Sequence, residues 1–175
     1  MSIKNVSIIG RGDFGQLLKN LCPKDVSCTT YGSKDTAANI QTIGASDVVI
    51  LSIPLASYPN VLEQLAPVLK PDTLLIDVCS VKIEPAKLIH QFLPNHQNLL
   101  ITHPLFGPLS YNNGNQGKNQ LTLVITESVG KKAKIVEEYC AKKLKLRALH
   151  MSDQEHDKRM AEIHALTFFI ARGLT

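Results

Sequence analysis

The stretch VSIIGRGDFG, residues 6–15, places three glycines directly after an apolar run. Val6–Ile9 predicts a strand, and the residues after Gly12 carry apolar side chains at the spacing of one helix face. In the pattern G-x-G-x-x-G the first glycine permits a tight turn and the second lets backbone amides approach a pyrophosphate. The third lets the helix pack closely on the strand. Because a strand, this loop and a helix follow in that order, the stretch predicts a dinucleotide-binding βαβ unit.

Strands and helices continue to alternate along the chain. The predicted strands cover residues 26–31, 47–52, 73–77 and 98–102, and the predicted helices cover residues 36–42, 61–68 and 84–93. This alternation is typical of an α/β fold of the Rossmann type, with a doubly wound, mainly parallel sheet. Further along, a loop is expected over residues 107–119. A strand, a helix and a strand over residues 121–126, 131–143 and 144–149 would then extend the sheet at one edge.

The last segment opens with Ser152–Glu155, in which the serine and the glutamate form a capping-box sequence. A long C-terminal helix is therefore predicted from this point onward. Its residues 163–170 are apolar on nearly every side, and such a helix needs a partner surface. We expect a dinucleotide-binding domain over residues 1–150, the start of a connecting helix over residues 151–175, and a homodimer formed through this helix.

Composition argues against several other classes of protein. Of the 175 residues, 44% are hydrophobic and 19% are charged, which is typical of one globular domain. Aromatic residues make up 5% and Trp is absent, so a surface that stacks nucleic-acid bases is not expected. The four cysteines show no metal-ligand spacing and are predicted to be reduced thiols of a cytoplasmic protein. No segment has the pattern of a signal peptide or a membrane span, so no membrane partner is expected either.

Two polar segments follow predicted strands: DVCSVK at residues 77–82 and THPLFGP at residues 102–108. The carboxyl ends of parallel strands gather at one edge of an open sheet, where ligands bind. We therefore predict that Ser80 and His103 are the catalytic residues, beside whatever the glycine-rich loop holds. Simpler roles stay open at this point, because Ser80 also suits the N-cap of the next helix and a histidine before proline can end a turn.

The residues after the second predicted strand bear on which dinucleotide binds. An NAD site usually has Asp or Glu there for the ribose 2′-hydroxyl. This chain has Ser33 and Lys34 instead, while Asp35 falls one residue too late. With Arg11 they suit a 2′-phosphate, so we expect NADP, with NAD as the alternative and an exposed turn as the competing interpretation. The predicted cofactor-binding residues are Gly10, Arg11, Gly12, Asp13, Phe14, Gly15, Ser33, Lys34, Ser52, Pro54 and Ser80.

Four segments follow one another along the chain: GRGDFG at residues 10–15, DVCSVK, THPLFGP and EHD at residues 155–157. In this order they resemble the prephenate/arogenate dehydrogenase family, in particular the plant-type arogenate dehydrogenases. The resemblance implies an NADP-dependent oxidoreductase of tyrosine biosynthesis that oxidatively decarboxylates arogenate or prephenate and passes hydride to the nicotinamide. It implies that His103 accepts the hydroxyl proton of the substrate, as a neutral imidazole can. Ser80 would bind the same hydroxyl or orient the imidazole, and Lys82 would hold the loop or the cofactor. The substrate-binding residues implied are Ser80, His103, Gly107 and His156.

The chain also departs from the family pattern. The family has a second histidine twelve positions after the one that matches His156, whereas this chain has Phe168 there and His164 one helical turn earlier. The family continues into an all-helical domain that dimerises and contributes an arginine to the substrate carboxylate. We expect that domain to be missing here, and Arg172 is no match for the arginine. The alternative is therefore a non-catalytic module that binds or senses NADP and assembles with a partner through the C-terminal helix. A third interpretation is another reductase of the same fold, acting on β-hydroxyacids or imines.

Overall fold

The computed structural model describes residues 3–114 and 121–173, without the side chains of residues 112–114, 164, 168, 169, 171 and 173. Seven strands in this part of the chain form one sheet in the order β2-β1-β3-β4-β5-β6-β7. They are β1 (Asn5–Ile9), β2 (Ser27–Tyr31), β3 (Val48–Leu51), β4 (Leu74–Asp77), β5 (Leu99–Pro104), β6 (Thr122–Val129) and β7 (Arg147–His150). All neighbouring strands run parallel except β5 and β6. The predicted α/β fold with a mainly parallel sheet and extra edge strands is confirmed.

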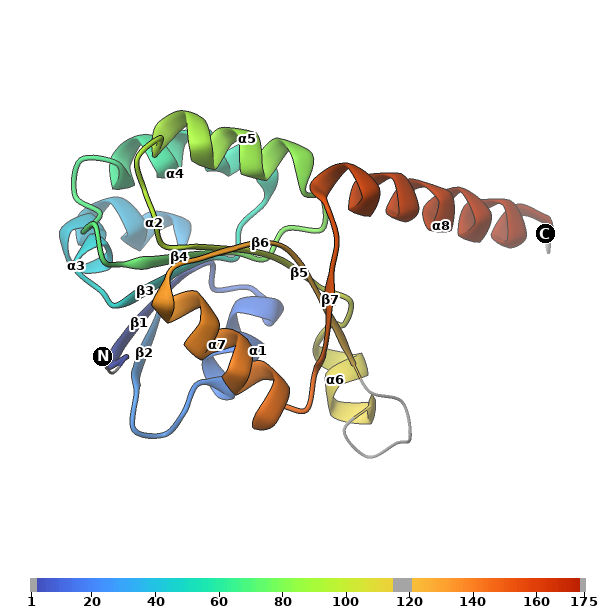
Figure 1. Ribbon diagram of the computed structural model, residues 1–175, viewed down its shortest axis with the longest axis horizontal. Coiled ribbons are helices and arrows are strands. Elements are labelled where there is room, and N and C mark those ends of the chain that lie inside the picture. Colours follow the sequence, from blue (N-terminus) through green and yellow to red (C-terminus); the bar gives the residue numbers. More distant parts are fainter. Residues whose placement is uncertain (1–2, 115–120, 174–175) are drawn as a thin grey trace.

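Helices cover both faces of the sheet (Figure 1). The α-helices of the described residues are α1 (Asp13–Leu21), α2 (Ser33–Thr36), α3 (Ile40–Gly44), α4 (Tyr58–Leu65), α5 (Ile83–Phe92), α6 (Pro108–Gly114), α7 (Lys131–Lys142) and α8 (Asp153–Gly173). The short α2 and α3 lie with α4 and α5 on one face, and α1, α6 and α7 lie on the other. Successive strand residues point to opposite faces, so Val49 and Leu51 join the core on the α4 side while Val48 and Ile50 join the core on the α1 side. The two layers therefore enclose two separate cores.

The strand order reverses between β1 and β3, the kind of position where an open doubly wound sheet binds ligands. β2 pairs with one edge of β1 and β3 pairs with the other, so that Ile9 at the end of β1 lies opposite both Tyr31 and Leu51. The N–H of Gly10 donates to the carbonyl of Tyr31 at 2.8 Å, and the N–H of Ser52 donates to the carbonyl of Ile9 at 2.8 Å. The loops that leave these three strands consequently start side by side.

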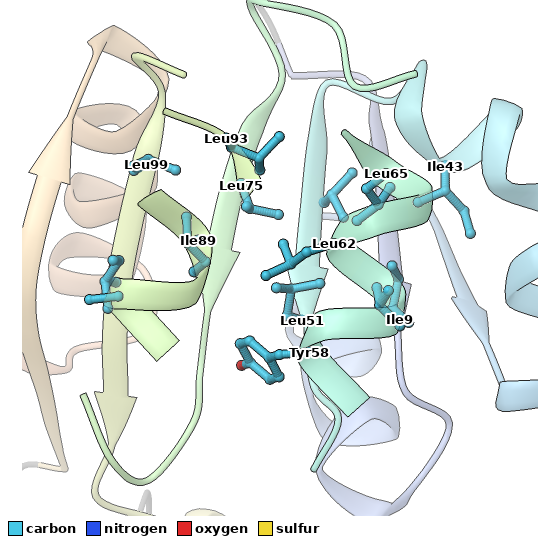
Figure 2. Close-up of a cluster of buried hydrophobic side chains, with 14 of the residues drawn as sticks. Ile9, Ile43, Leu51, Tyr58, Leu62, Leu65, Leu75, Ile89, Leu93 and Leu99 are labelled. Carbon is cyan, nitrogen blue, oxygen red and sulfur yellow. The ribbon is translucent and has the colours of Figure 1, made fainter. Parts of the chain in front are cut away.

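Figure 2 shows the hydrophobic cluster between the sheet and helices α4 and α5. Leu51 from β3, Leu62 from α4 and Ile89 from α5 are fully buried in it. Burial of these apolar side chains is what holds the helices on the sheet, because hydrogen bonds that replace bonds to water contribute less net stability. Tyr58 at the start of α4 is also fully buried at the edge of this cluster, and its hydroxyl contacts the last residue of β4.

Two predicted segments differ in the structure. The loop predicted over residues 107–119 contains helix α6, and residues 115–119 lie outside the described part of the chain. Pro108 suits the first position of a helix, where a missing N–H costs no intrahelical bond, and the N–H of Gly107 donates to Ser110 Oγ at 2.8 Å. The helix predicted over residues 36–42 is divided into α2, a 3-10 turn at Ala37–Asn39, and α3.

The long helix α8 projects away from the sheet, as Figure 1 shows. At its start Ser152 Oγ accepts the N–H of Glu155 at 3.1 Å, the first of the two bonds of the predicted capping box. Three apolar side chains further along are more than half exposed: Ile163, Leu166 and Ile170. The side chains of His164 and Phe168, which bear on the predicted second histidine, lie outside the described ones. Within residues 3–114 and 121–173, no helix is both long and apolar enough to cross a membrane.

We predict that Leu62→Ala lowers the free energy of unfolding by about 2–5 kcal/mol, because it leaves a cavity in the α4 core. Leu109→Ala, at a side chain that is 82% exposed, is the matched control and should change stability by less than about 0.5 kcal/mol. Urea denaturation followed by circular dichroism measures both values. Equal losses in the two variants would contradict the packing described here.

Candidate active site

The three glycines of the loop after β1 have different surroundings. A Cβ on Gly10, whose φ is +125°, would overlap the carbonyl oxygen of Ser52, and a Cβ on Gly15 would overlap the carbonyl oxygen of Gly10. Contacts within the protein therefore require glycine at both positions. A Cβ on Gly12, by contrast, would meet no atom within 4 Å. Gly12 is also the N-cap of α1, so it presents an open backbone where the helix dipole favours an anion.

A cleft of about 400 Å³ lies beside this loop and is formed by the loops that leave β1, β3 and β4. Its lining residues are Phe14, Ser52, Ile53, Pro54, Leu55, Val78, Cys79, Ser80 and Val81. Four residues predicted from the sequence, Phe14, Ser52, Pro54 and Ser80, are thus brought to one place. The structure accordingly has a cleft at the end of the sheet where the sequence predicts a ligand.

His103 lies on the strand next to β4, near the end of β5, and is not one of the residues that line the cleft. Its side chain is buried and 9% exposed. The segment that follows His103 leads back to the glycine-rich loop, because the ring of Phe106 lies 6.4 Å from the ring of Phe14. Gly107 follows at the start of α6, and a Cβ there would meet nothing within 4 Å.

A buried ion pair determines the path of the DVCSVK segment. Lys82 Nζ contacts Asp77 Oδ2, and both side chains are fully buried. Lys82 Nζ also donates to the carbonyl of Thr102 at 2.6 Å, and Thr102 Oγ1 donates to the carbonyl of Asp77 at 2.7 Å. The segment is therefore bound at both of its ends, to β4 and to β5, and Ser80 lies exposed on the turn between them. Lys82 holds the loop in place and does not reach the cleft surface.

Two further donors complete the surroundings of Asp77. The hydroxyl of Tyr58 donates to Asp77 Oδ1, and the N–H of Cys79 donates to the same oxygen at 3.0 Å. Burial raises the pKa of Asp77, whereas Lys82 and these two donors act in the opposite direction. Burial and then the charge of Asp77 raise the pKa of Tyr58, so its phenol stays protonated and acts as a donor.

Three side chains form a chain of hydrogen bonds between α8 and β5. Asp157 Oδ1 lies 2.7 Å from His156 Nδ1, and His156 Nε2 lies 2.9 Å from His103 Nδ1. The two imidazole rings meet edge to face, with centroids 5.1 Å apart and planes at 77°. His156 is 1% exposed. Both of its ring nitrogens make hydrogen bonds inside the protein, and the substrate contact predicted for it stays a prediction.

Asp157 also caps helix α5. Its Oδ1 accepts the N–H of Lys82 at 2.8 Å, and its Oδ2 accepts the N–H of Ile83 at 3.0 Å. Burial pushes the pKa of Asp157 upward, but the N–H of Ile83, the His156 ring and the N–H of Lys82 outweigh it and hold the pKa below its usual value. The alternative role considered for Ser80, the N-cap of this helix, is therefore wrong: Lys82 occupies that position and Asp157 from α8 supplies the capping oxygens.

At the end of β2, Arg11 and Asp35 form an ion pair of 2.5 Å, and Arg11 also donates to the carbonyl of Thr30 at 3.1 Å. Ser33 and Lys34 are exposed in the first turn of the four-residue helix α2. From its position in the sequence, Asp35 falls one residue too late to bind the ribose 2′-hydroxyl. The structure nevertheless brings its carboxylate against Arg11. A carboxylate therefore does stand in the region that was predicted to hold a 2′-phosphate.

Sequence reasoning missed Tyr58 as part of this region, and it named Asp157 only within the EHD segment. No pattern around Tyr58 pointed to Asp77, because the two residues meet only through the packing of α4 on the sheet. Asp157 had a signal, since it completes the EHD segment, but its contacts with α5 depend on the position of α8. Among the described residues, no group of His, Cys, Asp or Glu side chains is arranged to hold a metal ion, and no metal was predicted.

The sequence comparisons place the chain in the prephenate dehydrogenase family. Residues 23–142 match the nucleotide-binding domain of prephenate dehydrogenases. The chain is 35% identical over 134 residues to arogenate dehydrogenase 1, chloroplastic, of Arabidopsis thaliana. This alignment covers 68% of the chain and 20% of that relative. It is 29% identical over 194 residues to arogenate dehydrogenase 2, chloroplastic, of the same plant. That alignment covers 99% of the chain and 53% of the relative. The chain thus spans about a fifth of one relative and about half of the other.

Solved structures share the fold. A crystal structure of prephenate dehydrogenase from A. aeolicus, in complex with hydroxyphenyl propionate and NAD+, superposes with a TM-score of 0.69 at 19% sequence identity. The superposition covers 99% of this chain and 70% of that one. At this identity the likeness supports the Rossmann-type fold alone.

We predict that Lys82→Met lowers the free energy of unfolding by about 3–5 kcal/mol, because it leaves the carboxylate of Asp77 buried without its counter-charge. The double variant Lys82→Met/Asp77→Asn should lose less, since the asparagine oxygen can still accept the bonds from Tyr58 and Cys79. Lys142→Met removes an exposed ion pair with Glu138 and should cost no more than about 1 kcal/mol. Urea denaturation compares the three, and a double variant less stable than Lys82→Met would contradict this account.

Proposed function

Because the chain belongs to the prephenate dehydrogenase family, we propose that it binds a nicotinamide dinucleotide and acts in the oxidative decarboxylation of arogenate or prephenate. The family membership confirms the resemblance seen in the sequence. The observation that carries the proposal is the juxtaposition at one end of the sheet: an open backbone at Gly12, a cleft with Ser80 on its wall, and His103 at the end of the adjoining strand.

The loop after β1 has the chemistry that a pyrophosphate needs. Gly12 leaves the backbone accessible, and the N-terminus of α1 adds partial positive charge at the same point. Ser52 and Pro54 lie across the cleft, on the other side of the position where the strand order reverses. A dinucleotide that starts at the loop would extend over the ends of β1, β3 and β4, which is how the fold usually receives this cofactor.

We propose NADP as the preferred form, with NAD as the alternative. Arg11, Ser33 and Lys34 offer a guanidinium, a hydroxyl and an ammonium at the end of β2, where the adenosine ribose would lie. Asp35 argues in the other direction, because its carboxylate would repel a 2′-phosphate and could accept bonds from ribose hydroxyls. Its ion pair with Arg11 partly neutralises that charge.

In the reaction, His103 would take the proton of the ring hydroxyl as a general base. Ser80 would donate a hydrogen bond to the same oxygen or orient the imidazole, and Gly107 would let the substrate approach the backbone at α6. The nicotinamide, when bound, supplies the hydride acceptor for the ring carbon that carries this hydroxyl. Loss of carbon dioxide then makes the ring aromatic, so the step is effectively irreversible.

A non-catalytic module that binds NADP is the second candidate. It is favoured by the exposed apolar side chains of α8, which call for a covering partner. We propose that residues 1–150 form the dinucleotide-binding unit and that residues 151–175 begin a connecting helix through which two copies associate. The cytoplasmic location stays a prediction, and two relatives carry names that place them in chloroplasts.

Gly12→Ala should fold normally and bind NADP at least about tenfold more weakly, a loss of 1.4 kcal/mol or more in binding free energy. The added methyl meets no protein atom but occupies the space open to the pyrophosphate. Gly15→Ala is the matched comparison and should lose stability instead, by about 1–3 kcal/mol, because its Cβ overlaps a carbonyl. Isothermal titration and thermal melting measure the two effects. Failure of the unchanged chain to bind either NADP or NAD would sink the proposal.

Asp35→Asn should tighten NADP binding by about fivefold, the factor for 1 kcal/mol of repulsion between charges about 4 Å apart in water. It should leave NAD binding unchanged or weaker. Lys34→Ala should weaken NADP binding and spare NAD. Isothermal titration of each variant with both dinucleotides tests this, and a chain that binds NAD more tightly than NADP would contradict the preference.

His103→Asn should lower the turnover of arogenate or prephenate by about 10²–10⁴-fold, the usual contribution of a general base. Dinucleotide affinity should stay within about twofold of the unchanged chain, since His103 lies off the cleft that holds the cofactor. Absorbance at the reduced nicotinamide band measures turnover by the single chain and by the associated pair of copies proposed above. Binding of NADP with no turnover of either substrate would favour the non-catalytic module.

A further inference from the structure

Resting on the proposed function, we propose that His156 is a positioning residue that, held by Asp157, sets the tautomer of His103 and shares its charge when it is protonated. Nothing in the family match assigns this role. The three groups come from elements far apart in the chain, β5 and α8, and meet in a buried site.

The direction of each hydrogen bond follows from the acceptor at its end. A carboxylate has no proton to give, and the lowered pKa of Asp157 keeps it ionised. His156 Nδ1 therefore carries the proton that Asp157 Oδ1 accepts at 2.7 Å. In a neutral His156 the other nitrogen, Nε2, is then an acceptor, so His103 Nδ1 must donate to it across 2.9 Å. This assigns the lone pair of His103 to Nε2, the form that can act as a base there.

The same bonds accommodate the proton that His103 would gain. The O–H bond of the substrate breaks and an N–H bond forms at His103 Nε2, so the imidazole becomes a cation. Its Nδ1 proton can move along the hydrogen bond to His156 Nε2. The result is a neutral His103 and an imidazolium at His156, adjacent to the carboxylate of Asp157. Because His156 is 1% exposed, this opposite charge acts with little screening by water.

Asp157 is itself held in place by other groups. The N–H groups of Lys82 and Ile83 bind its two oxygens at 2.8 Å and 3.0 Å, at the start of α5. Such fixed donors limit rotation of the carboxylate, so His156 has one preferred ring position. The orientation of His103 is therefore coupled to the cap of α5 and to the docking of the first turn of α8.

The test reads the tautomers directly, by ¹⁵N chemical shifts of the histidine rings in this chain without substrate. We expect His103 and His156 in the Nδ1–H form. His156→Gln should preserve the His103 tautomer, because the amide oxygen accepts and the amide N–H donates as the imidazole does. His156→Leu should shift His103 towards the Nε2–H form or a mixture. An Nε2–H form of His103 in the unchanged chain, or an unchanged tautomer in His156→Leu, would overturn the proposal.

Kinetics separates this role from a merely structural one. His156→Leu should lower kcat by roughly 10-fold to 100-fold with a small change in KM, less than loss of the base itself. His156→Gln should retain more activity than His156→Leu, because glutamine keeps the hydrogen bonds to both Asp157 and His103. Equal activity in the two variants would count against the positioning role. If the tautomers are as expected but the unchanged chain turns over neither substrate, the proposed function fails while the assigned hydrogen bonds stand.

A separate observation concerns Cys22 and Cys28. Cys22 ends α1 and Cys28 lies in β2, and their half-buried sulfurs are 2.8 Å apart. We propose that these two thiols form a reversible intramolecular disulfide. Two S–H bonds are lost, one S–S bond of about 2.05 Å is made, and the two electrons reduce a small-molecule disulfide to two thiols.

The chemistry of the pair supports this assignment. The hydrogen bond from Cys22 lowers the pKa of Cys28, which favours the thiolate that attacks a disulfide. Burial raises the pKa of Cys79, and it raises that of Cys140 to about 11, so these thiols are poorer nucleophiles. Cys28 pairs with Val6 near the start of β1, at the end of the sheet remote from Gly10. Oxidation should therefore leave dinucleotide binding intact.

Treatment of the folded chain with glutathione disulfide, followed by peptide mass spectrometry, tests the proposal. We expect one peptide in which Cys22 and Cys28 are joined with the loss of two hydrogens, and its reversal by dithiothreitol. Cys28→Ser should abolish the product, whereas the control Cys140→Ser should not. A chain that stays fully reduced, or that carries only glutathione adducts at these two residues, would overturn it.

Discussion

The contact between Asp77 and Lys82 is the constraint on which the rest of this site depends. Both charges are fully buried, which is unfavourable unless the remaining hydrogen-bonding groups are satisfied. Tyr58, the N–H of Cys79 and the carbonyl of Thr102 satisfy them. The pair therefore holds only when α4, β4 and β5 are all in place, and in return it determines the turn that carries Ser80.

Helix α8 contributes to the site although most of it extends away from the sheet. Its first turn inserts His156 and Asp157 between β5 and α5, where Asp157 replaces a local N-cap for α5 and His156 binds His103. A helix N-terminus whose cap comes from a distant segment cannot form its final structure before that segment docks. The edge of the sheet that carries His103 and the start of α8 are thus parts of one structural unit.

Some of this organisation was predictable from the sequence because its causes are local. The glycine loop combines a strand, a tight turn and a helix within ten residues, and the buried strands are recognisable as short apolar runs. Other features were not predictable. Residues 108–114 are rich in Asn, Gly and Ser, which locally favour a loop, yet they form α6. Ser80 has the right residue type and position for an N-cap, but the carboxylate of Asp157 takes that role from 77 residues further along the chain, counting from Ser80.

By itself the sequence determined the alternating α/β pattern, the glycine loop and the two polar segments that begin at the ends of β4 and β5. These depend on residue type and spacing, which short-range steric and hydrophobic effects translate into local structure. The tertiary structure alone decided which side chains meet. The Asp77–Lys82 pair with Tyr58, the Arg11–Asp35 pair and the Asp157–His156–His103 chain all depend on packing between separate elements. Hydrogen-bond partners and burial are properties of those packed surfaces, and no pattern along the chain encodes them in readable form.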